Sequence, residues 1–259
     1  MVTTIEISGY MESALDALVL AGIYSSKTEA VRDAIRRLLD GFDMKEVAVK
    51  AYKNGAISVQ LAAEISGLSL DETIWLLISK DVAPELGVRD EAELSQSLEG
   101  LRGRNDLVLD LTSVYSLLEL GLLDIVTRLG KRVLMPEAAK GKSQAMIMKF
   151  SKLRGLIVAL DGLETVKVGR NLSEFSRKSG ITIQEAHAIY VAKKMNGVLV
   201  SDDIRARKVA KGVGVASAPT LALLVLAKDM GILGDSRFKE ALTKMSALPL
   251  MVPQALLSP

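Results

Sequence analysis

Four carboxylates have the side-chain type and the spacing that chemistry at a metal ion would need. Asp110 follows the apolar segment LVL, while Asp202 and Asp203 follow the apolar segment VLVS. Glu185 lies near the start of the helical pattern ITIQEAHAIYVA. Two adjacent acids repel each other, so a pair at the end of a buried strand either caps the next helix or holds a cation.

The composition restricts which cation such a site could take. The chain of 259 residues has no cysteine, which excludes thiolate ligands and disulfides. It has one histidine, His187, which excludes a multi-histidine site. Oxygen ligands remain, and they suit Mg²⁺ or Mn²⁺. His187 follows Glu185 by two positions and so points elsewhere on the helix, where we expect a structural role.

Helix capping is the alternative explanation for these acids. Thr182 and Glu185 have the spacing of a capping box, in which Glu185 would accept only a backbone N–H. Asp202 likewise suits an N-cap position. Asp110 has no cap assignment as good, and this favours a carboxylate cluster. Both interpretations stay open at the level of sequence.

The elements that carry these acids alternate between strand and helix. LVLD, RVLMPE and VLVS are apolar runs of strand length, and helical patterns separate them. This rhythm predicts an α/β fold with a mainly parallel sheet and helices on both faces. Sites in such sheets form at the carboxyl ends of the strands, where Asp110, Asp202 and Asp203 are expected.

Residues 106–259 resemble the PIN-like nuclease domains. The resemblance is carried by the order and spacing of LDLTS at 109–113, VLMP at 133–136, QEAHAI at 184–189 and VLVSDDIRARKVA at 198–210. PTLALLVLAKDMGIL at 219–233 fits the same pattern. The resemblance implies a ribonuclease whose clustered carboxylates bind one or two Mg²⁺ or Mn²⁺ ions.

The resemblance also implies roles for individual residues. Asp110, Glu185, Asp202 and Asp203 would be the metal ligands, with a hydroxyl of Thr112 or Ser113 assisting. The residues expected to bind the RNA backbone are Arg205, Arg207, Lys208 and Lys211. One departure weakens the match: Lys142 stands about where the pattern has a glutamate, and Glu137 lies more than a helical turn too early to replace it.

VTTIEIS at 2–8 reads as a short strand, and a capping box of Ser26 and Glu29 opens a helix that ends before Gly41. In the pieces IEIS at 5–8 and YSSKTEAVRDAIRRLL at 24–39, residues 1–42 resemble the ribbon-helix-helix family. A lone strand must pair with a copy of itself. The resemblance implies a homodimer through this ribbon, with Thr4 and Glu6 facing the major groove of operator DNA.

Residues 43–85 read as three short helices separated by glycine turns, which is typical of a helix-turn-helix. AVKAYKNGAISVQLAAEISG at 48–67 resembles antitoxin-like proteins of prokaryotic toxin–antitoxin loci. The third helix begins with acidic residues, so protein–protein packing is favoured over DNA reading. The polar segment 86–105 is predicted to be a linker with a short helix in EAELSQSLE.

Charge differs between the two parts of the chain. Residues 1–105 have 11 Lys/Arg against 17 Asp/Glu, whereas residues 106–259 have 22 against 14. An acidic N-terminal part could therefore cover a basic C-terminal part of the same chain. There is no signal-peptide pattern and no apolar run long enough to span a bilayer, so we expect a cytoplasmic protein without membrane contacts.

Two functional hypotheses follow. In the first, the chain is a toxin–antitoxin-type fusion, with a Mg²⁺- or Mn²⁺-dependent ribonuclease restrained by an N-terminal dimeric module that binds DNA. In the second, the PIN-like domain is degenerate because of Lys142, and the protein is a DNA-binding regulator or an architectural dimer. The separations of the four carboxylates distinguish the two.

Overall fold

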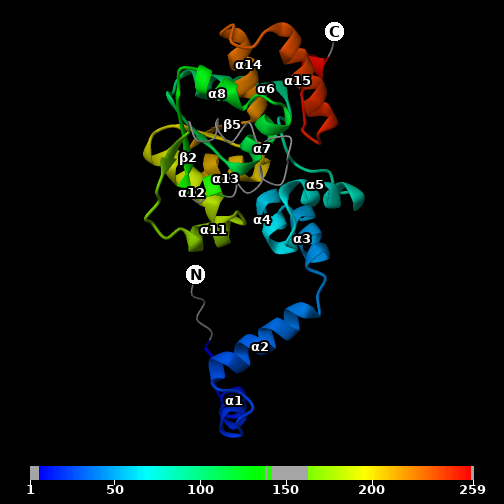
Figure 1. Ribbon diagram of the computed structural model, residues 1–259, viewed down its shortest axis with the longest axis vertical. Coiled ribbons are helices and arrows are strands. Elements are labelled where there is room, and N and C mark those ends of the chain that lie inside the picture. The colour runs from blue at the N-terminus through cyan, green and yellow to red at the C-terminus, as the bar shows by residue number, and fades with distance from the viewer. Residues whose placement is uncertain (1–5, 138, 142–162, 258–259) are drawn as a thin grey trace.

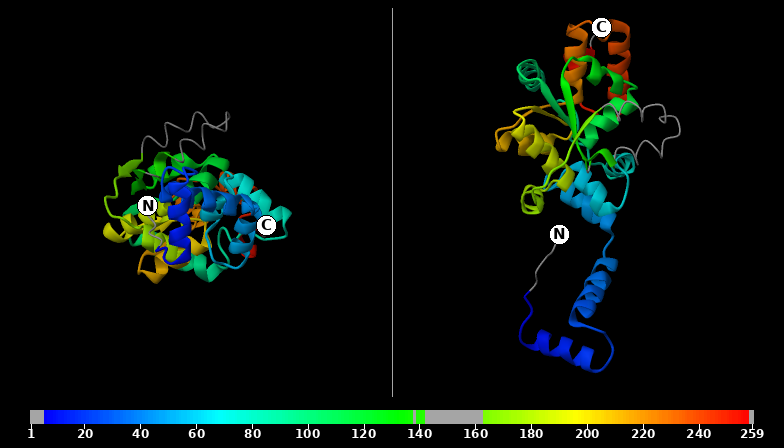
Figure 2. Two further views of the ribbon diagram at one scale, coloured as in Figure 1. Left: turned by 90° about the horizontal axis from the view of Figure 1, so that it is seen from below. Right: turned by 60° about the vertical axis from the view of Figure 1, so that its left-hand side comes forward.

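The N-terminal part of the computed structural model is helical. The structure describes residues 6–137, 139–141 and 163–257. Two helices form an arm that projects from the rest of the molecule (Figures 1 and 2), and three more follow as a compact bundle. The five are α1 (Tyr10–Leu20), α2 (Lys27–Asp40), α3 (Met44–Lys53), α4 (Val59–Ser66) and α5 (Leu70–Ser79).

Local signals explain where these helices begin and end. The Ser58 side chain accepts a hydrogen bond from the Leu61 N–H and caps α4. Ser69 and Glu72 form a capping box at α5, as predicted. Gly67 ends α4 with a φ of 70°, which favours glycine. At α2 the capping differs from the prediction, because Glu29 accepts from the backbone N–H of Ser25 and not from that of Ser26.

The C-terminal part contains one five-stranded sheet in which all pairs are parallel, as predicted. Its order is β3-β2-β1-β4-β5. The strands are β1 (Asp106–Leu109), β2 (Arg132–Pro136), β3 (Glu164–Val166), β4 (Val198–Val200) and β5 (Ala216–Ala218). The chain runs outward from β1 through β2 to β3, then returns to the other side of β1 as β4 and continues outward to β5. A ligand site is expected between β1 and β4, where the direction of strand addition reverses.

Helices cover both faces of the sheet. Alternate strand residues explain this, since Leu107 and Leu109 enter one apolar cluster and Val108 enters the other. The helices are α6 (Glu91–Arg102), α7 (Leu111–Glu119), α8 (Leu123–Arg128), α11 (Ser173–Ser179), α12 (Ile183–Lys194), α13 (Ile204–Gly212), α14 (Thr220–Asp229), α15 (Asp235–Ala247) and α16 (Gln254–Leu257).

The helices α3–α5 share a core with the α/β domain. Val59 and Ala62 of α4 are fully buried and belong to the same apolar cluster as Leu109 of β1. The arm is different, because among residues 6–42 only Ala30 is a buried apolar residue. The predicted helix-turn-helix is therefore an integral part of the C-terminal core, and the arm stands apart from it.

The structure corrects the predicted linker at 86–105. Residues 91–102 form the helix α6, whose Leu94 and Leu101 are buried in the core. The residues before it are also fixed, since the Gly87 N–H donates to the Asp202 carbonyl at 2.8 Å. The polar composition suggested a linker because α6 buries only three residues, Leu94, Ser97 and Leu101, and its others are half-buried or exposed.

The predicted ribbon is not visible in the described residues. Residues 6–8 have no regular structure, and residues 1–5 lie outside the described residues. The two helices expected after the strand are present as α1 and α2. The ribbon-helix-helix and its dimer stay predictions.

Candidate functional site

Three of the four predicted carboxylates come together at the carboxyl ends of the central strands. Asp110 follows β1 and Asp203 lies just beyond β4, and these strands are neighbours, with Leu109 opposite Val200. Glu185 reaches the same place from the first turn of α12. Each side chain is at most 2% exposed. Their charges act on one another, since both Asp203 and Asp110 raise the pKa of Glu185.

Asp110 accepts hydrogen bonds on both carboxylate oxygens. Oδ1 accepts from the Ser113 N–H at 2.9 Å and from the Thr112 hydroxyl at 2.7 Å. Oδ2 accepts from the Ser201 hydroxyl at 2.6 Å and from the Gln60 amide at 3.1 Å. Burial is the largest influence and raises the pKa of Asp110 to about 6 despite these donors.

Glu185 has one bonded oxygen and one without a partner. Oε2 accepts from the Thr182 N–H and from the Ser58 hydroxyl, each at 2.7 Å. Oε1 is buried and has no hydrogen-bond partner in the structure. Burial, followed by the neighbouring Asp203, raises the pKa of Glu185 well above its usual value. An unpartnered buried carboxylate oxygen indicates that a proton or a cation belongs there.

Asp203 is the N-cap of α13 and also contacts α4. Its Oδ1 accepts from the Ala206 N–H at 3.0 Å, and its Oδ2 accepts from the Val59 N–H at 2.7 Å. Burial raises the pKa of Asp203, and the backbone donors oppose this only in part. Asp203 also lines a cavity of about 50 Å³ between the α3–α4 turn and the α/β domain.

Asp202 accepts its side-chain hydrogen bonds from the first turn of α14, whereas the other three acids accept theirs at the starts of α7, α12 and α13. Its two oxygens accept from the Thr220 N–H at 2.8 Å and from the Thr220 hydroxyl at 2.7 Å. Both bonds fix the first turn of α14. Both oxygens of Asp202 thus face α14 in this structure, and its role as a metal ligand stays a prediction. The N-cap of α13 is Asp203, one position later than the capping interpretation expected.

The first turn of α4 covers the three clustered acids. The Ser58 hydroxyl, the Val59 N–H and the Gln60 amide donate to Glu185, Asp203 and Asp110 in turn. The turn before α4 lies directly against Gly180. A Cβ at Gly180 would stand 1.9 Å from the Ala56 carbonyl oxygen, and the Ser58 N–H donates to the Gly180 carbonyl at 2.8 Å.

Capping and clustering turn out to be compatible. Asp110 is the N-cap of α7, Asp203 is the N-cap of α13, and Glu185 completes the capping box of α12. The prediction that Asp110 has no good cap was therefore wrong. The N-termini of these three helices and of α4 meet at the acids, and their partial positive charges stabilise the carboxylates.

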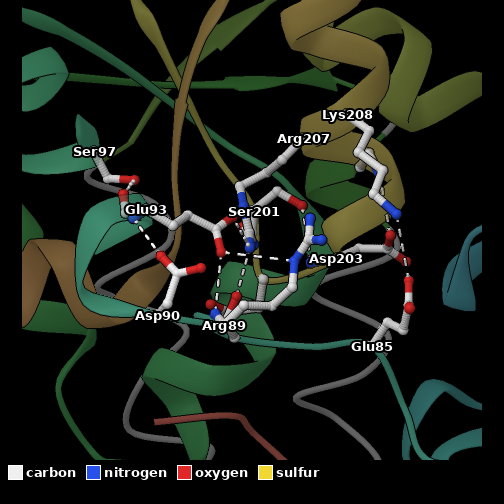
Figure 3. Close-up of polar contacts among 12 residues, drawn as sticks. Glu85, Arg89, Asp90, Glu93, Ser97, Ser201, Asp203, Arg207 and Lys208 are labelled. Atoms are coloured by element: carbon white, nitrogen blue, oxygen red, sulfur yellow. Dashed lines mark hydrogen bonds and ion pairs between the residues drawn. The ribbon is translucent and has the colours of Figure 1, made fainter. Parts of the chain in front are cut away.

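Two of the four predicted RNA-binding residues bind within the protein. Arg207 is only 4% exposed, donates to the Ser201 carbonyl at 2.7 Å and pairs with Glu93 at 3.0 Å (Figure 3). Arg205 donates to the Ser179 and Gly55 carbonyls and so anchors the turn before α4. Both are structural contacts, contrary to the prediction.

Lys208 and Lys211 lie on the accessible side of α13. Both line a groove of about 860 Å³ between α6 and α13, together with Arg89 and Arg104. Lys208 pairs with Glu85 at 3.7 Å, beside the small cavity that contains Asp203 (Figure 3). These two lysines remain available to an anionic ligand.

The donor chemistry suits a hard cation, but the arrangement described here does not seat one. The donors are carboxylates, with one buried oxygen unpartnered. Within the described residues, however, no three acids are arranged to hold a metal ion. Both oxygens of Asp110 and of Asp203 already accept hydrogen bonds, one each from α4.

Several contributors were missed, and others cannot be placed. Ser201 was not singled out, although it directly precedes the two acids in VLVSDD. Ser58 was seen only as the start of a helix, and nothing in the sequence marked Gln60. His187 is partly buried away from the cluster, where burial lowers its pKa. Lys142 and Thr4 lie outside the described residues, while Glu137 and Glu6 are exposed.

Comparison with known proteins fits this geometry. Residues 106–258 match DUF3368, a family of PIN domains, and this is more than half of the chain. The chain belongs to this PIN-domain family. The PIN domain thus begins at β1 and contains all three clustered acids, whereas the turn that covers them lies outside it.

A curated protein matches a different part of the chain. The UPF0175 protein VNG_0066H of Halobacterium salinarum is 30% identical over 87 residues, which is 33% of this chain and 89% of that protein. The match lies in the region before the PIN domain. No solved structure matches the chain. Among the described residues, none of the helices has the length and apolarity to cross a membrane.

Proposed function

We propose that the PIN domain is a Mg²⁺- or Mn²⁺-dependent endoribonuclease, and that the chain is a toxin–antitoxin-type fusion. The observation that supports this most strongly is the burial of Asp110, Glu185 and Asp203 at one end of the sheet, with an oxygen of Glu185 unpartnered. Keeping three interacting carboxylates out of water is costly unless a cation or protons compensate.

In this proposal the clustered acids hold the metal and the adjacent groove holds the substrate. Asp110, Glu185 and Asp203 are the ligands, and the bound ion would lower the pKa of a water molecule. Thr112 positions the cluster, because its hydroxyl donates to Asp110 and accepts the Asp202 N–H at 3.0 Å. Lys208 and Lys211 bind the phosphate backbone from the groove between α6 and α13.

Cleavage of RNA with Mn²⁺ tests the proposal. Wild-type protein should cut a structured RNA only when Mn²⁺ or Mg²⁺ is added, and Asp110→Asn should reduce the rate by at least about a hundredfold. Asp124→Asn, an exposed aspartate on α8, is the matched control and should behave as wild type. Equal rates for the wild type and Asp110→Asn would contradict the proposal.

The N-terminal part is proposed to form a homodimer that binds operator DNA. The arm exposes several large apolar residues, among them Leu38 and Leu39, which are 61% and 47% exposed. A second copy of the chain, paired through the predicted ribbon at 2–8, would cover such a surface. Thr4 and Glu6 remain the proposed groove contacts. Binding of fluorescent operator DNA, compared between wild type and Thr4→Ala/Glu6→Ala, tests this.

A second candidate is favoured by the capping contacts. Because each clustered acid accepts a hydrogen bond at the start of a helix, the PIN domain could serve as a scaffold for a dimeric DNA-binding regulator. The two candidates differ in metal binding. Calorimetry should show Mn²⁺ binding that Asp110→Asn abolishes if the nuclease proposal holds, and no binding by any variant if the scaffold proposal holds.

A further inference from the structure

One helical turn supplies a hydrogen-bond donor to every acid of the cluster. Ser58, Val59 and Gln60 are consecutive, yet each donates to a different carboxylate, at distances of 2.7, 2.7 and 3.1 Å. The side chains of Ser58 and Gln60 are at most 5% exposed, and Val59 is fully buried. Such a one-to-one match, over at least 50 residues of chain separation, indicates a specific contact.

The first turn of α4 places a positive electrostatic potential beside the clustered acids, at the position that a bound cation would occupy. The N-terminus of a helix has a partial positive charge, and its free N–H groups bind anions. The acidic net charge of residues 1–105 would oppose contact with an acidic cluster. The contact forms nevertheless, because neutral donors and a helix N-terminus meet the acids. The predicted attraction between an acidic part and a basic part stays a prediction beside this contact, and two ion pairs, Arg207–Glu93 and Lys208–Glu85, do join the two parts.

The turn competes for the oxygens that a metal ion would use. A divalent ion such as Mg²⁺ requires about six oxygens at close range in a regular arrangement. The Gln60 amide and the Val59 N–H each donate to an oxygen of Asp110 or Asp203, and the Ser58 hydroxyl donates to one of Glu185. In this arrangement no three acids among the described residues are placed to hold a metal ion, and the first turn of α4 stands against the side of the acids that it contacts.

We propose that residues 58–60 are a built-in inhibitor that occupies the carboxylate site of the PIN domain in competition with a divalent cation. The inference rests on the proposed function, in that the same acids are taken as the metal ligands. In this inference, the region that is similar to the UPF0175 protein contacts and inhibits the PIN domain of its own chain. The turn is secured by Arg205, which donates to the Gly55 carbonyl.

The test uses the full chain with the two side-chain donors removed. Ser58→Ala/Gln60→Ala keeps every acid of the cluster. The matched control is Ser69→Ala/Gln96→Ala, which removes the N-cap of α5 and an exposed glutamine without touching the acids. Loss of a cap is thereby separated from loss of the contact. Calorimetry with Mn²⁺ and amide hydrogen exchange over residues 56–66 are measured on the wild type and both variants.

Mn²⁺ should bind the Ser58→Ala/Gln60→Ala variant about tenfold more tightly than wild type, while the control binds as wild type does. In wild type, added Mn²⁺ should also speed exchange in the first turn of α4, because the ion displaces it. This second measurement needs no substitution. Equal Mn²⁺ affinity in both double variants, or Mn²⁺ binding to wild type without faster exchange, overturns the inference.

RNA cleavage separates this inference from the proposed function. If Mn²⁺ binds more tightly after Ser58→Ala/Gln60→Ala but no RNA is cut, the competition between residues 58–60 and the cation is supported and the nuclease proposal fails. If wild type and this variant cut RNA at the same rate, the nuclease stands and the inhibitor fails. If none of the proteins binds Mn²⁺, competition for a metal is refuted along with the metal-dependent nuclease.

Discussion

At the scale of single residues, the site shows how buried acids can be tolerated without a metal ion. Asp110, Glu185 and Asp203 each accept hydrogen bonds at the start of a helix, so backbone N–H groups supply part of the compensation. Burial still dominates and raises the pKa of all three. When no metal is bound, each of these acids therefore holds its proton more tightly in the folded protein than in the unfolded chain.

The raised pKa of Asp110 predicts a pH-dependent effect of Asp110→Asn on stability. Below about pH 3 the carboxyl is mostly protonated in both the folded and the unfolded chain and has little effect. As the pH rises toward the folded-state pKa of about 6, ionisation increasingly costs the folded state stability, and this cost levels off above it. Relative to wild type, Asp110→Asn should therefore gain about 2–3 kcal/mol in unfolding free energy between pH 4 and pH 7.

Urea denaturation at several pH values, with a chelator present, measures this difference. Titrating groups away from the cluster cancel in the comparison, whereas the pKa of Glu185, which Asp110 raises, changes with the substitution and contributes to the difference. A difference that does not change with pH, or that changes in favour of the wild type, would show that the pKa of Asp110 is not raised.

Removing the charge of two basic residues of α13 is expected to have different effects: one substitution should reduce stability, and the other should weaken RNA binding. Arg207→Met should reduce the unfolding free energy by about 3 kcal/mol, because it removes the buried donor of the Ser201 and Gly87 carbonyls and one of the two cations paired with Glu93. Lys211→Met should change stability by less than about 0.5 kcal/mol and should weaken RNA binding. Chemical denaturation and RNA fluorescence anisotropy check the pair. Weaker RNA binding by a fully stable Arg207→Met would restore Arg207 as an RNA contact.

The acids could be found from the sequence, but their surroundings could not. Asp110 and Asp203 follow apolar strands, and the spacing of Thr182 and Glu185 is a local signal that the structure reproduces. Gln60 lies 50 residues from Asp110, and no periodicity links the two. Arg207 was predicted to bind RNA, and the sequence did not reveal its burial against Glu93 of α6.

At the scale of elements, the close approach of the α3–α4 turn to Gly180 is the contact that we expect to hold the turn against the α/β domain. Gly180→Ala would place a methyl group against the Ala56 carbonyl and should push the turn away. Gly67→Ala is the control, because Gly67 has nearly the same φ but open space around it. Both share the backbone cost of alanine in that conformation, about 1 kcal/mol.

Hydrogen exchange should distinguish these two variants. Gly180→Ala should speed exchange over residues 56–61 and reduce stability by more than Gly67→Ala does, whereas Gly67→Ala should leave the exchange of those amides unchanged. Equal exchange in the two variants would mean that the turn is not held tightly against the α/β domain.

The arm formed by α1 and α2 makes its own prediction. If a second copy covers it, Leu38→Glu should convert a dimer into a monomer in sedimentation experiments. Met230→Glu is the control, because Met230 is similarly exposed, at 50%, but lies on the C-terminal domain. A protein that remains dimeric after Leu38→Glu, or that is monomeric as wild type, would contradict dimerisation through the arm.

At the scale of the whole molecule, the sequence separated parts that the structure joins. The three short helices at 44–79 and the α/β fold were predicted as separate domains. One apolar cluster nevertheless runs from Tyr52 and Val59 through Leu109 to the last helices. The sequence did not reveal this shared core, because each buried residue of the three helices also fits the apolar stripe of its own helix. This shared core keeps α4 on the carboxylates.

The most direct test of the central claim is to locate Mn²⁺ in crystals of the Ser58→Ala/Gln60→Ala variant by anomalous scattering. We expect a peak coordinated by Asp110, Glu185 and Asp203, with the first turn of α4 withdrawn and Asp202 still bound to Thr220. A crystal soaked in Mn²⁺ that shows no peak among these three acids, or a peak beside an α4 that has not moved, would contradict the claim.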